Sequence, residues 1–104
     1  MHEICLARMD KTRPVVVLTR DAARPAMSKV TVAPITSTVK GLSSEVSVGP
    51  ENGLDHECAV SIDNVLTIPA NSLGRTIGSL SPEQERELAR AFVFAYDLNI
   101  PLLT

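Results

Sequence analysis

Three groups of polar residues occur where apolar segments begin, end or break, and such positions commonly carry sites. Arg13 opens one apolar run, Thr36 stands near the end of another, and the pair Asp63-Asn64 interrupts a third. A guanidinium fixed at the start of a strand offers a rigid bidentate donor for a phosphate. A threonine hydroxyl can donate to a phosphoryl oxygen, and an acid–amide pair can read base edges or hold an arginine in place. The sequence therefore contains the parts of a phosphate-binding site.

Each of these residues also has a purely structural explanation. Arg13 can be a solvated charge at a strand end, and Thr36 can cap a turn with its hydroxyl. Asp63 and Asn64 can form a bulge stabilised by local side-chain hydrogen bonds. From residue types and spacing alone, the structural explanation is preferable for Arg13, and both explanations stay open for the other residues.

The sequence gives little support for catalysis by histidine, by a bound metal ion or by a phosphate-binding loop. His2 and His56 are the only imidazoles, and neither has a nucleophile or ligand pattern nearby, so we interpret both as surface residues. No cluster of cysteine, histidine and acid has metal-ligand spacing, and no glycine-rich phosphate loop occurs. We interpret Cys5 and Cys58 as reduced, small apolar residues. We therefore expect neither a metal nor another cofactor.

Length and composition describe an ordinary globular protein. The chain has 104 residues, of which 44% are apolar and 21% charged, and we expect one domain over residues 1–104. No apolar run is long enough to span a bilayer, and the N-terminus lacks the basic and apolar regions of a signal peptide. These features predict a cytoplasmic protein without a membrane partner.

The formal net charge of −2 argues against a general nucleic-acid-binding protein, which would be basic. The charge is uneven, however. Residues 1–40 contain seven basic and three acidic residues, whereas residues 41–104 contain three basic and nine acidic ones. A basic N-terminal part is compatible with a local site for a polyanion, and equally compatible with chance.

Apolar periodicity predicts a mainly β domain. The expected strands are Glu3–Met9, Arg13–Thr19, Lys29–Ile35, Glu45–Val48, Cys58–Ile68 and Gly74–Gly78. The second is apolar enough to be covered on both faces. The alternation shifts near Asp63-Asn64, which predicts a bulge in the fifth strand. Arg20–Ser28 should be a loop with one helical turn around Asp21–Ala23, and Gly49–Glu57 a series of turns. Pro34 should end, bend or expose the third strand, because it lacks a backbone N–H.

A C-terminal helix is the clearest local feature. Ser81 is a suitable N-cap, Pro82 suits the first helical position, and Gln84 completes a capping box. One face of the helix carries an apolar stripe at helical spacing, formed by Leu88, Phe92 and Ala95. Short strands followed by one terminal helix predict a small β-barrel or a strongly bent sheet capped by that helix.

The last turns of this helix, Ala91–Tyr96, are apolar almost all round, which a single core-facing stripe does not require. We infer a second buried surface, most simply a subunit interface. The three aromatic residues of the chain lie in this stretch. We interpret them as core-packing residues and not as a base-stacking platform. Pro101 should end the regular structure.

Four stretches together resemble the MazF/PemK/Kid family of toxin endoribonucleases, in the same order and over nearly the whole chain. They are RPVVVLT, VAPITSTVKGLSSEV, GLDHECAVSIDNVLTI and LGRTIGSLSPEQ. The resemblance implies an SH3-like small barrel of the CcdB/PemK type with a C-terminal helix, assembled as a homodimer. It also implies a toxin of a type II toxin–antitoxin system that cleaves single-stranded RNA sequence-specifically and without a metal ion. A MazE-type antitoxin would cover the site with an extended segment.

The family's motifs imply roles for residues of this chain. Arg13 matches the arginine before the proline, and Thr36 matches the threonine of the Pro-x-Thr segment, which implies that both are catalytic. In the family, the ribose 2′-OH attacks the adjacent phosphorus and leaves a 2′,3′-cyclic phosphate and a 5′-OH. Arg13 would stabilise the charge of the phosphorane, and Thr36 would hydrogen-bond the scissile phosphate. The residues expected to bind RNA are Lys11, Ser37, Thr38, Asp63 and Asn64.

The chain departs from the family pattern at three places. His2-Glu3-Ile4-Cys5 replaces Gly-acid-Ile-Trp, the loop before the arginine is reduced to Met9–Thr12, and Leu66 stands where an arginine is usual. In the family the longer loop gates the RNA groove, so we expect differences in groove width, cut sequence and antitoxin contacts.

Two alternatives share the same expected fold. One is a CcdB-like gyrase-binding toxin, against which the absence of tryptophan counts, because that group usually ends in Trp-Gly-Ile. The other is a non-catalytic binding module, which would tolerate loss of Arg13.

Overall fold

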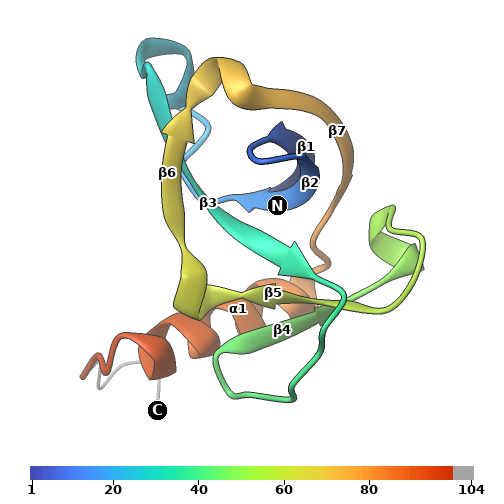
Figure 1. The fold of residues 1–104 in the computed structure, drawn as a ribbon. Coiled ribbons are helices and arrows are strands. Elements are labelled where there is room, and N and C mark those ends of the chain that lie inside the picture. Colours follow the sequence, from blue (N-terminus) through green and yellow to red (C-terminus); the bar gives the residue numbers. More distant parts are fainter. Residues whose placement is uncertain (100–104) are drawn as a thin grey trace.

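The structure is a computed structural model that describes residues 1–99 (Figure 1). The strands and the helix in this range are β1 (Glu3–Arg8), β2 (Thr12–Val17), β3 (Lys29–Thr36), β4 (Glu45–Val48), β5 (Cys58–Ser61), β6 (Leu66–Pro69), β7 (Leu73–Ser79) and α1 (Pro82–Ala95). Short 3-10 turns are η1 (Arg24–Ala26), η2 (Pro50–Asn52), η3 (Ile62–Asn64) and η4 (Ala70–Ser72). The predicted mainly β fold with a C-terminal helix is confirmed. Pro101, expected to end the regular structure, lies outside the described residues.

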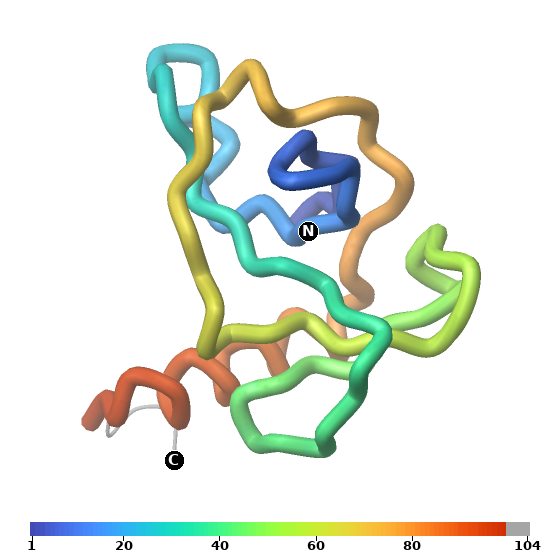
Figure 2. The backbone as a smooth tube through the Cα atoms, viewed as in Figure 1, coloured from blue at the N-terminus to red at the C-terminus, as the bar shows by residue number. Residues whose placement is uncertain are grey.

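The strands form one strongly bent antiparallel sheet. Its order is β4-β5-β3-β2-β1-β7, and β6 also pairs with β3. In the tube of Figure 2, the β6–β7 segment curves around the N-terminal hairpin of β1 and β2, while α1 lies at the side of β4 and β5. This curvature produces a half-barrel, in agreement with the strongly bent sheet that the strand pattern predicts and with the SH3-like fold that the family resemblance implies.

β3 is the strand that connects the two parts of this sheet. Its first half, Lys29–Val32, pairs with β6, and its last residues, Ile35 and Thr36, pair with β5. Pro34 lies between these two ladders and opposite Val15 of β2. A residue without a backbone N–H fits there, because neither β5 nor β6 pairs with it. The strand therefore continues through Pro34 and changes partner.

The predicted fifth strand, Cys58–Ile68, is in fact two strands, so this prediction is wrong. The turn η3 separates β5 from β6. Ser44 Oγ donates to Asp63 Oδ2 at 2.5 Å, and Asn64 Nδ2 donates to Ser61 Oγ at 2.7 Å. The Asn64 bond is local, of the kind that Asn side chains often prefer to a place in a strand, whereas Ser44 is 19 residues from Asp63. The turn lets β5 pair with the end of β3 and β6 with its beginning.

The remaining boundaries differ little from prediction. The β2–β3 loop turns at Asp21–Ala23, as predicted, where the N–H of Ala23 donates to the carbonyl of Arg20, and the 3-10 helix η1 follows directly at Arg24–Ala26. Pro25 favours this additional helical turn, since its fixed φ suits the first turn of a helix. The other strands begin and end within two residues of their predicted limits, which is the usual uncertainty of such boundaries.

Apolar residues are buried on both faces of the sheet. The larger cluster faces the helix and contains Ile4, Val16, Ala33, Ile35, Val46, Val48, Cys58, Val60, Ile62, Leu80, Leu88 and Ala91. The smaller cluster contains Ala7, Val15, Val30, Val32 and Ile68. Neighbouring residues along a strand point to opposite faces, so β2 and β3 contribute to both clusters. The burial of Val15, Val16 and Val17 confirms that β2 is covered on both faces.

The helix begins as predicted, with a capping box. The N–H of Gln84 donates to Ser81 Oγ at 3.2 Å, and the N–H of Ser81 donates to Gln84 Oε1 at 2.9 Å. Leu88 is buried in the larger cluster, and Phe92 and Ala95 pack against it. Among the described residues, no helix is long and apolar enough to cross a membrane.

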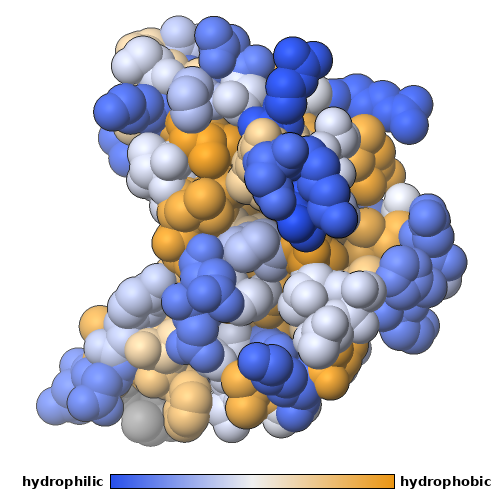
Figure 3. Space-filling model, in the orientation of Figure 1, coloured by the Kyte–Doolittle hydropathy of each residue, from blue (hydrophilic) through white to orange (hydrophobic). Residues whose placement is uncertain are grey.

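The C-terminal end of the helix is only partly covered. Phe94 and Tyr96 are 62% and 48% exposed, so the prediction that they are core residues is wrong. A helix presents one face to the core, and Phe94 lies outside that face. Tyr96 stacks on Phe92 with ring centroids 5.7 Å apart and donates to the carbonyl of Ile62 at 3.2 Å, but it stands at the edge of the core, where about half of it stays exposed. Figure 3 shows that apolar residues also reach the surface at other places among polar ones. The exposed rings agree with the inferred second surface for another chain.

A buried pair of amide side chains ties the helix to the sheet. Gln84 Oε1 accepts from Asn52 Nδ2 at 2.7 Å, and Gln84 Nε2 donates to Asn52 Oδ1 at 3.1 Å and to the carbonyl of Ser47 at 3.0 Å. Asn52 Nδ2 also donates to the carbonyl of Ser79, and Asn52 Oδ1 accepts the N–H of Gly49, both at 3.0 Å. The pair thus connects η2, β4, β7 and α1.

Candidate active site

Arg13 is the second residue of β2, and Asp10 holds its guanidinium at the surface. Arg13 Nε donates to Asp10 Oδ1 and Arg13 Nη2 donates to Asp10 Oδ2, both at 3.0 Å. The bonds from the guanidinium, together with one from the N–H of Lys11, lower the pKa of Asp10 to about 2. The carboxylate in turn raises the pKa of Arg13, which stays charged. The Arg13 side chain is 41% exposed, so a ligand can reach it.

Thr36 is the last residue of β3 and is half-buried. Its Oγ1 accepts the N–H of Thr38 at 3.0 Å. Because this bond uses the oxygen only as an acceptor, the hydroxyl hydrogen remains available to donate. Thr36 therefore acts as a turn cap, and at the same time it offers a donor to a bound group.

Strand register puts Arg13 and Thr36 on one face of the sheet. Val15 of β2 lies opposite Pro34 of β3. Arg13 and Thr36 each lie two residues beyond this pair in the same direction, and residues two apart share a face. Arg13 also pairs with Ala7, which belongs to the smaller apolar cluster. Both residues therefore stand on the face of that cluster, away from the helix.

A cavity of about 460 Å³ opens beside Thr36. The end of β3, the β3–β4 loop, the start of β4 and the β5–η3 segment surround it. Its lining residues are Pro34, Thr36, Thr38, Lys40, Leu42, Glu45, Ser61, Asp63 and Asn64. Because η3 follows β5, which pairs with the end of β3, the chain turns back beside Thr36 and brings Asp63 to the same cavity.

The cavity unites four of the seven predicted site residues, namely Thr36, Thr38, Asp63 and Asn64. The other three, Arg13, Lys11 and Ser37, are not among its lining residues. Lys11 and Ser37 are exposed, the first in the β1–β2 turn and the second next to Thr36.

Two acidic residues near the site were not predicted from the sequence. Asp10 could have been found, since an acid three residues before Arg13 in a short turn is within reach of it. Glu45 had no such signal, because it reads as the outward member of an alternating strand. In the structure, Glu45 Oε1 accepts the N–H groups of Lys40 (3.2 Å), Gly41 (2.8 Å) and Leu42 (3.2 Å). This carboxylate holds the β3–β4 loop against the cavity.

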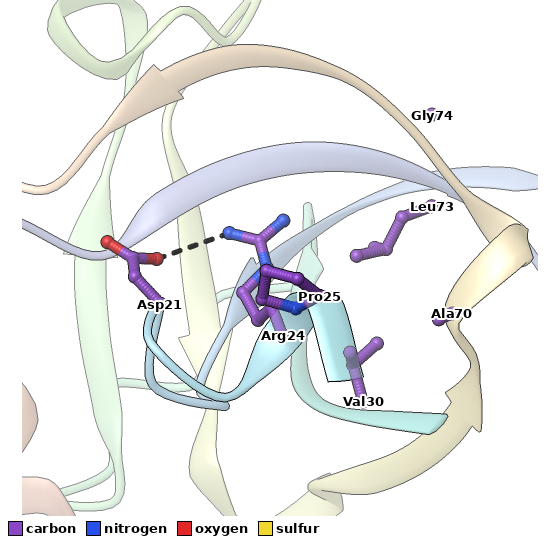
Figure 4. Close-up of a pocket in the computed structure, with 7 residues that line it drawn as sticks. All are labelled: Asp21, Arg24, Pro25, Val30, Ala70, Leu73 and Gly74. Carbon is purple, nitrogen blue, oxygen red and sulfur yellow. Dashed lines mark hydrogen bonds and ion pairs between the residues drawn. The ribbon is translucent and has the colours of Figure 1, made fainter. Parts of the chain in front are cut away.

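A second cavity, of about 490 Å³, contains none of the predicted site residues (Figure 4). It lies between the β2–β3 loop and the start of β7. Its charged donor, Arg24, is already engaged, since Arg24 Nη1 donates to Glu3 Oε1 at 2.7 Å and to Asp21 Oδ1 at 3.4 Å. The cavity beside Thr36 is therefore the better candidate. Within residues 1–99, no three His, Cys, Asp or Glu side chains lie close enough to hold a metal ion.

Comparison with known proteins gives the family of the chain. Residues 3–95 match the family described as the PemK-like, MazF-like toxin of type II toxin–antitoxin systems. The endoribonuclease MazF3 of Mycobacterium tuberculosis strain H37Rv is 52% identical over 99 residues, which cover 95% of this chain and 96% of the relative.

Solved structures show the same fold. The Mycobacterium tuberculosis toxin MazF-mt6 superposes with a TM-score of 0.91 at 51% identity, over 94% of this chain and 99% of that chain. An endoribonuclease from mycobacterial species, solved in complex with its cognate antitoxin, shares the fold with a TM-score of 0.83 at 21% identity, over 95% of both chains. The chain therefore belongs to the PemK-like, MazF-like family of toxins.

Proposed function

We propose that this chain is the toxin of a type II toxin–antitoxin system and acts as a sequence-specific, metal-independent endoribonuclease on single-stranded RNA. Family membership and the 52% identity to a protein named an endoribonuclease support this function. The observation that carries it is the position of Arg13 and Thr36 on one face of neighbouring strands, next to a polar cavity. A basic group and a hydroxyl donor on the same face suit one phosphate.

In the proposed reaction, the ribose 2′-oxygen attacks the adjacent phosphorus, and the bond from phosphorus to the 5′-oxygen of the next nucleotide breaks. The 2′-hydroxyl loses a proton and the leaving oxygen gains one, so the products are a 2′,3′-cyclic phosphate and a 5′-OH. The positive charge of Arg13 stabilises the negative charge that develops on the phosphorane. We assign it no role in proton transfer, because the pKa of arginine is too high for efficient transfer at neutral pH. Thr36 donates to a non-bridging phosphoryl oxygen.

The remaining predicted residues serve as RNA contacts in this proposal. Lys11 and Ser37 are exposed and lie close in sequence to Arg13 and Thr36, and they bind the RNA backbone. Thr38, Asp63 and Asn64 line the cavity and hold the nucleotide beside the scissile phosphate. Exposed lysine and hydroxyl groups are common backbone contacts in nucleic-acid complexes.

The same proposal includes partners and location. Residues 1–104 act as one toxin domain, and two chains form a homodimer in which the exposed rings of Phe94 and Tyr96 become buried. A MazE-type antitoxin covers the RNA site, as the family description and the antitoxin complex of a related fold support. The protein works in the cytoplasm, where its RNA substrates and its antitoxin are found.

Incubation of the purified protein with total RNA in EDTA tests the function directly. We expect cuts at a short recurring sequence, with 5′-OH ends downstream and 2′,3′-cyclic phosphate ends upstream of each cut. Mapping of the 5′-OH ends by sequencing gives the recognition sequence at the same time. Intact RNA, or cleavage only after addition of a divalent metal ion, would overturn the proposal.

A further inference from the structure

The cavity beside Thr36 has a charge that does not suit a phosphate. Its charged lining residues are one base, Lys40, and two acids, Glu45 and Asp63. A phosphate placed there would face an excess of negative charge, and like charges a few ångströms apart repel each other. Arg13, the strongest phosphate donor of the site, is not among the lining residues. The phosphate therefore belongs at the rim with Arg13 and Thr36, and another part of the nucleotide belongs in the cavity.

Both carboxylates are oriented by bonds to the protein. Asp63 Oδ2 accepts from the hydroxyl of Ser44, which is only 2% exposed. Glu45 Oε1 accepts the three successive N–H groups of residues 40–42. Within residues 1–99, the second oxygen of each carboxylate receives no hydrogen bond, although each carboxylate can accept several. The cavity thus contains two fixed acceptor groups with free capacity.

Apolar atoms complete the lining. Pro34 and Leu42 border the same cavity, and Leu42 is 48% exposed. A flat ring can lie against these two side chains while its edge meets the acidic ones. Proteins that recognise single-stranded RNA commonly bind splayed bases in this way, with apolar contact to the face and hydrogen bonds to the edge.

We propose that this cavity binds a nucleobase with an exocyclic amino group, and that Asp63 and Glu45 determine this preference. Cytosine, adenine and guanine each carry amino hydrogens that a carboxylate oxygen can accept, whereas uracil offers carbonyl oxygens and a single ring N–H. The base would belong to a nucleotide next to the phosphate at Thr36. This inference rests on the proposed ribonuclease function and adds a base class to it.

The test compares cleavage of a randomised single-stranded RNA pool by the wild type and by Asp63→Asn, with all 5′-OH ends sequenced. At one position near the cut, we expect the wild type to disfavour uracil by roughly tenfold or more. In Asp63→Asn, the amide oxygen keeps the bond from Ser44 and the amide nitrogen becomes a donor. The preference at that position should therefore weaken or reverse in favour of uracil, while Glu45→Gln should weaken it less.

Asp55→Asn is the matched control, because it removes one exposed negative charge from a residue that does not line the cavity. It should leave the preference unchanged. Sequence-specific cleavage by the wild type in which uracil is not disfavoured at any position near the cut would overturn the base site and leave the ribonuclease function intact. An unchanged preference in a folded Asp63→Asn protein would overturn the role of Asp63. Failure of the wild type to cut any RNA would overturn the ribonuclease function itself.

Discussion

The buried amide pair and the candidate active site use polar side chains in opposite ways. Asn52 and Gln84 are 2% and 6% exposed, and each amide oxygen and nitrogen is hydrogen-bonded within the protein. Thr36, Asp63 and Glu45 also form internal bonds, but each keeps capacity for another partner. This difference distinguishes residues that hold the fold from residues that can bind a ligand. A buried hydrogen-bond network in which every group has a partner stabilises one fold, whereas exposed groups with remaining hydrogen-bonding capacity can bind another molecule. Substitutions in the two regions should therefore affect different quantities.

The largest expected effect is on catalysis, from Arg13→Ala and Thr36→Ala. Loss of a group that stabilises charge in the transition state commonly lowers the rate by about 100-fold or more. We expect each variant to lose RNA cleavage and growth arrest by at least this factor. Both side chains are partly exposed and lie outside the two apolar clusters, so the thermal midpoint should change little. Thr36→Ala should lower it slightly, because the N–H of Thr38 loses its acceptor. Cleavage kinetics and thermal melting measure the two quantities separately.

Two further variants sharpen this prediction. Thr36→Ser keeps the hydroxyl and should retain most of the activity. Thr67→Ala is the control: it removes the exposed hydroxyl of a β6 residue, which is hydrogen-bonded to the Thr31 hydroxyl of β3, and it should leave cleavage unchanged. Full activity of both Arg13→Ala and Thr36→Ala at equal protein concentration would contradict the assignment of the site.

Gln84→Met should have the reverse effect, a loss of stability without loss of chemistry. Methionine is similar in length, but it leaves one amide hydrogen of Asn52, the carbonyl of Ser47 and the N–H of Ser81 without their partner. Buried polar groups without partners cost on the order of 2–3 kcal/mol in the free energy of unfolding. Urea denaturation should show this loss, while kcat/KM per folded molecule stays constant. Glu83→Met, at an exposed position of the same helix, is the control.

The contrast between scaffold and site also explains which features could be predicted from the sequence. The N-terminus of the helix and the limits of β4 depend on local signals, the capping box and the alternation of Glu45–Val48, and both were predicted correctly. The division of Cys58–Ile68 into two strands depends on Ser44, which is distant in sequence and donates to Asp63. Periodicity shows only that the pattern breaks there. It does not show whether the break is a bulge or a turn.

The candidate site was predictable to a similar extent. Arg13 and Thr36 follow from the family motifs, and their shared face follows from strand register. The cavity does not, because it forms only when β5 pairs with the end of β3 and returns the chain to Thr36. The role of Glu45 requires the fold of the β3–β4 loop, where Gly41 adopts a φ of +73°. Such a conformation is favourable for glycine, but the sequence alone does not show which carboxylate accepts the N–H groups of this loop.

The smallest expected effect concerns Asp10, which holds Arg13 through an exposed contact and not through a buried network. The bond from Arg13 lowers the pKa of Asp10 from its ordinary value of 3.8 to about 2. The contribution of the pair to stability is thus present above the ordinary pKa and is lost as the pH falls through about 2. Exposed pairs of this kind are weak and screened by salt, so Asp10→Asn should leave the thermal midpoint near pH 7 unchanged.

NMR titration of the Asp10 carboxyl carbon should give a midpoint near 2. In Arg13→Ala the midpoint should rise but stay below 3.8, since the N–H of Lys11 still donates to the carboxylate. A midpoint near 3.8 in the wild type would show that Asp10 does not hold the guanidinium, and Arg13 would then lack the preorganisation that distinguishes it from an ordinary surface charge.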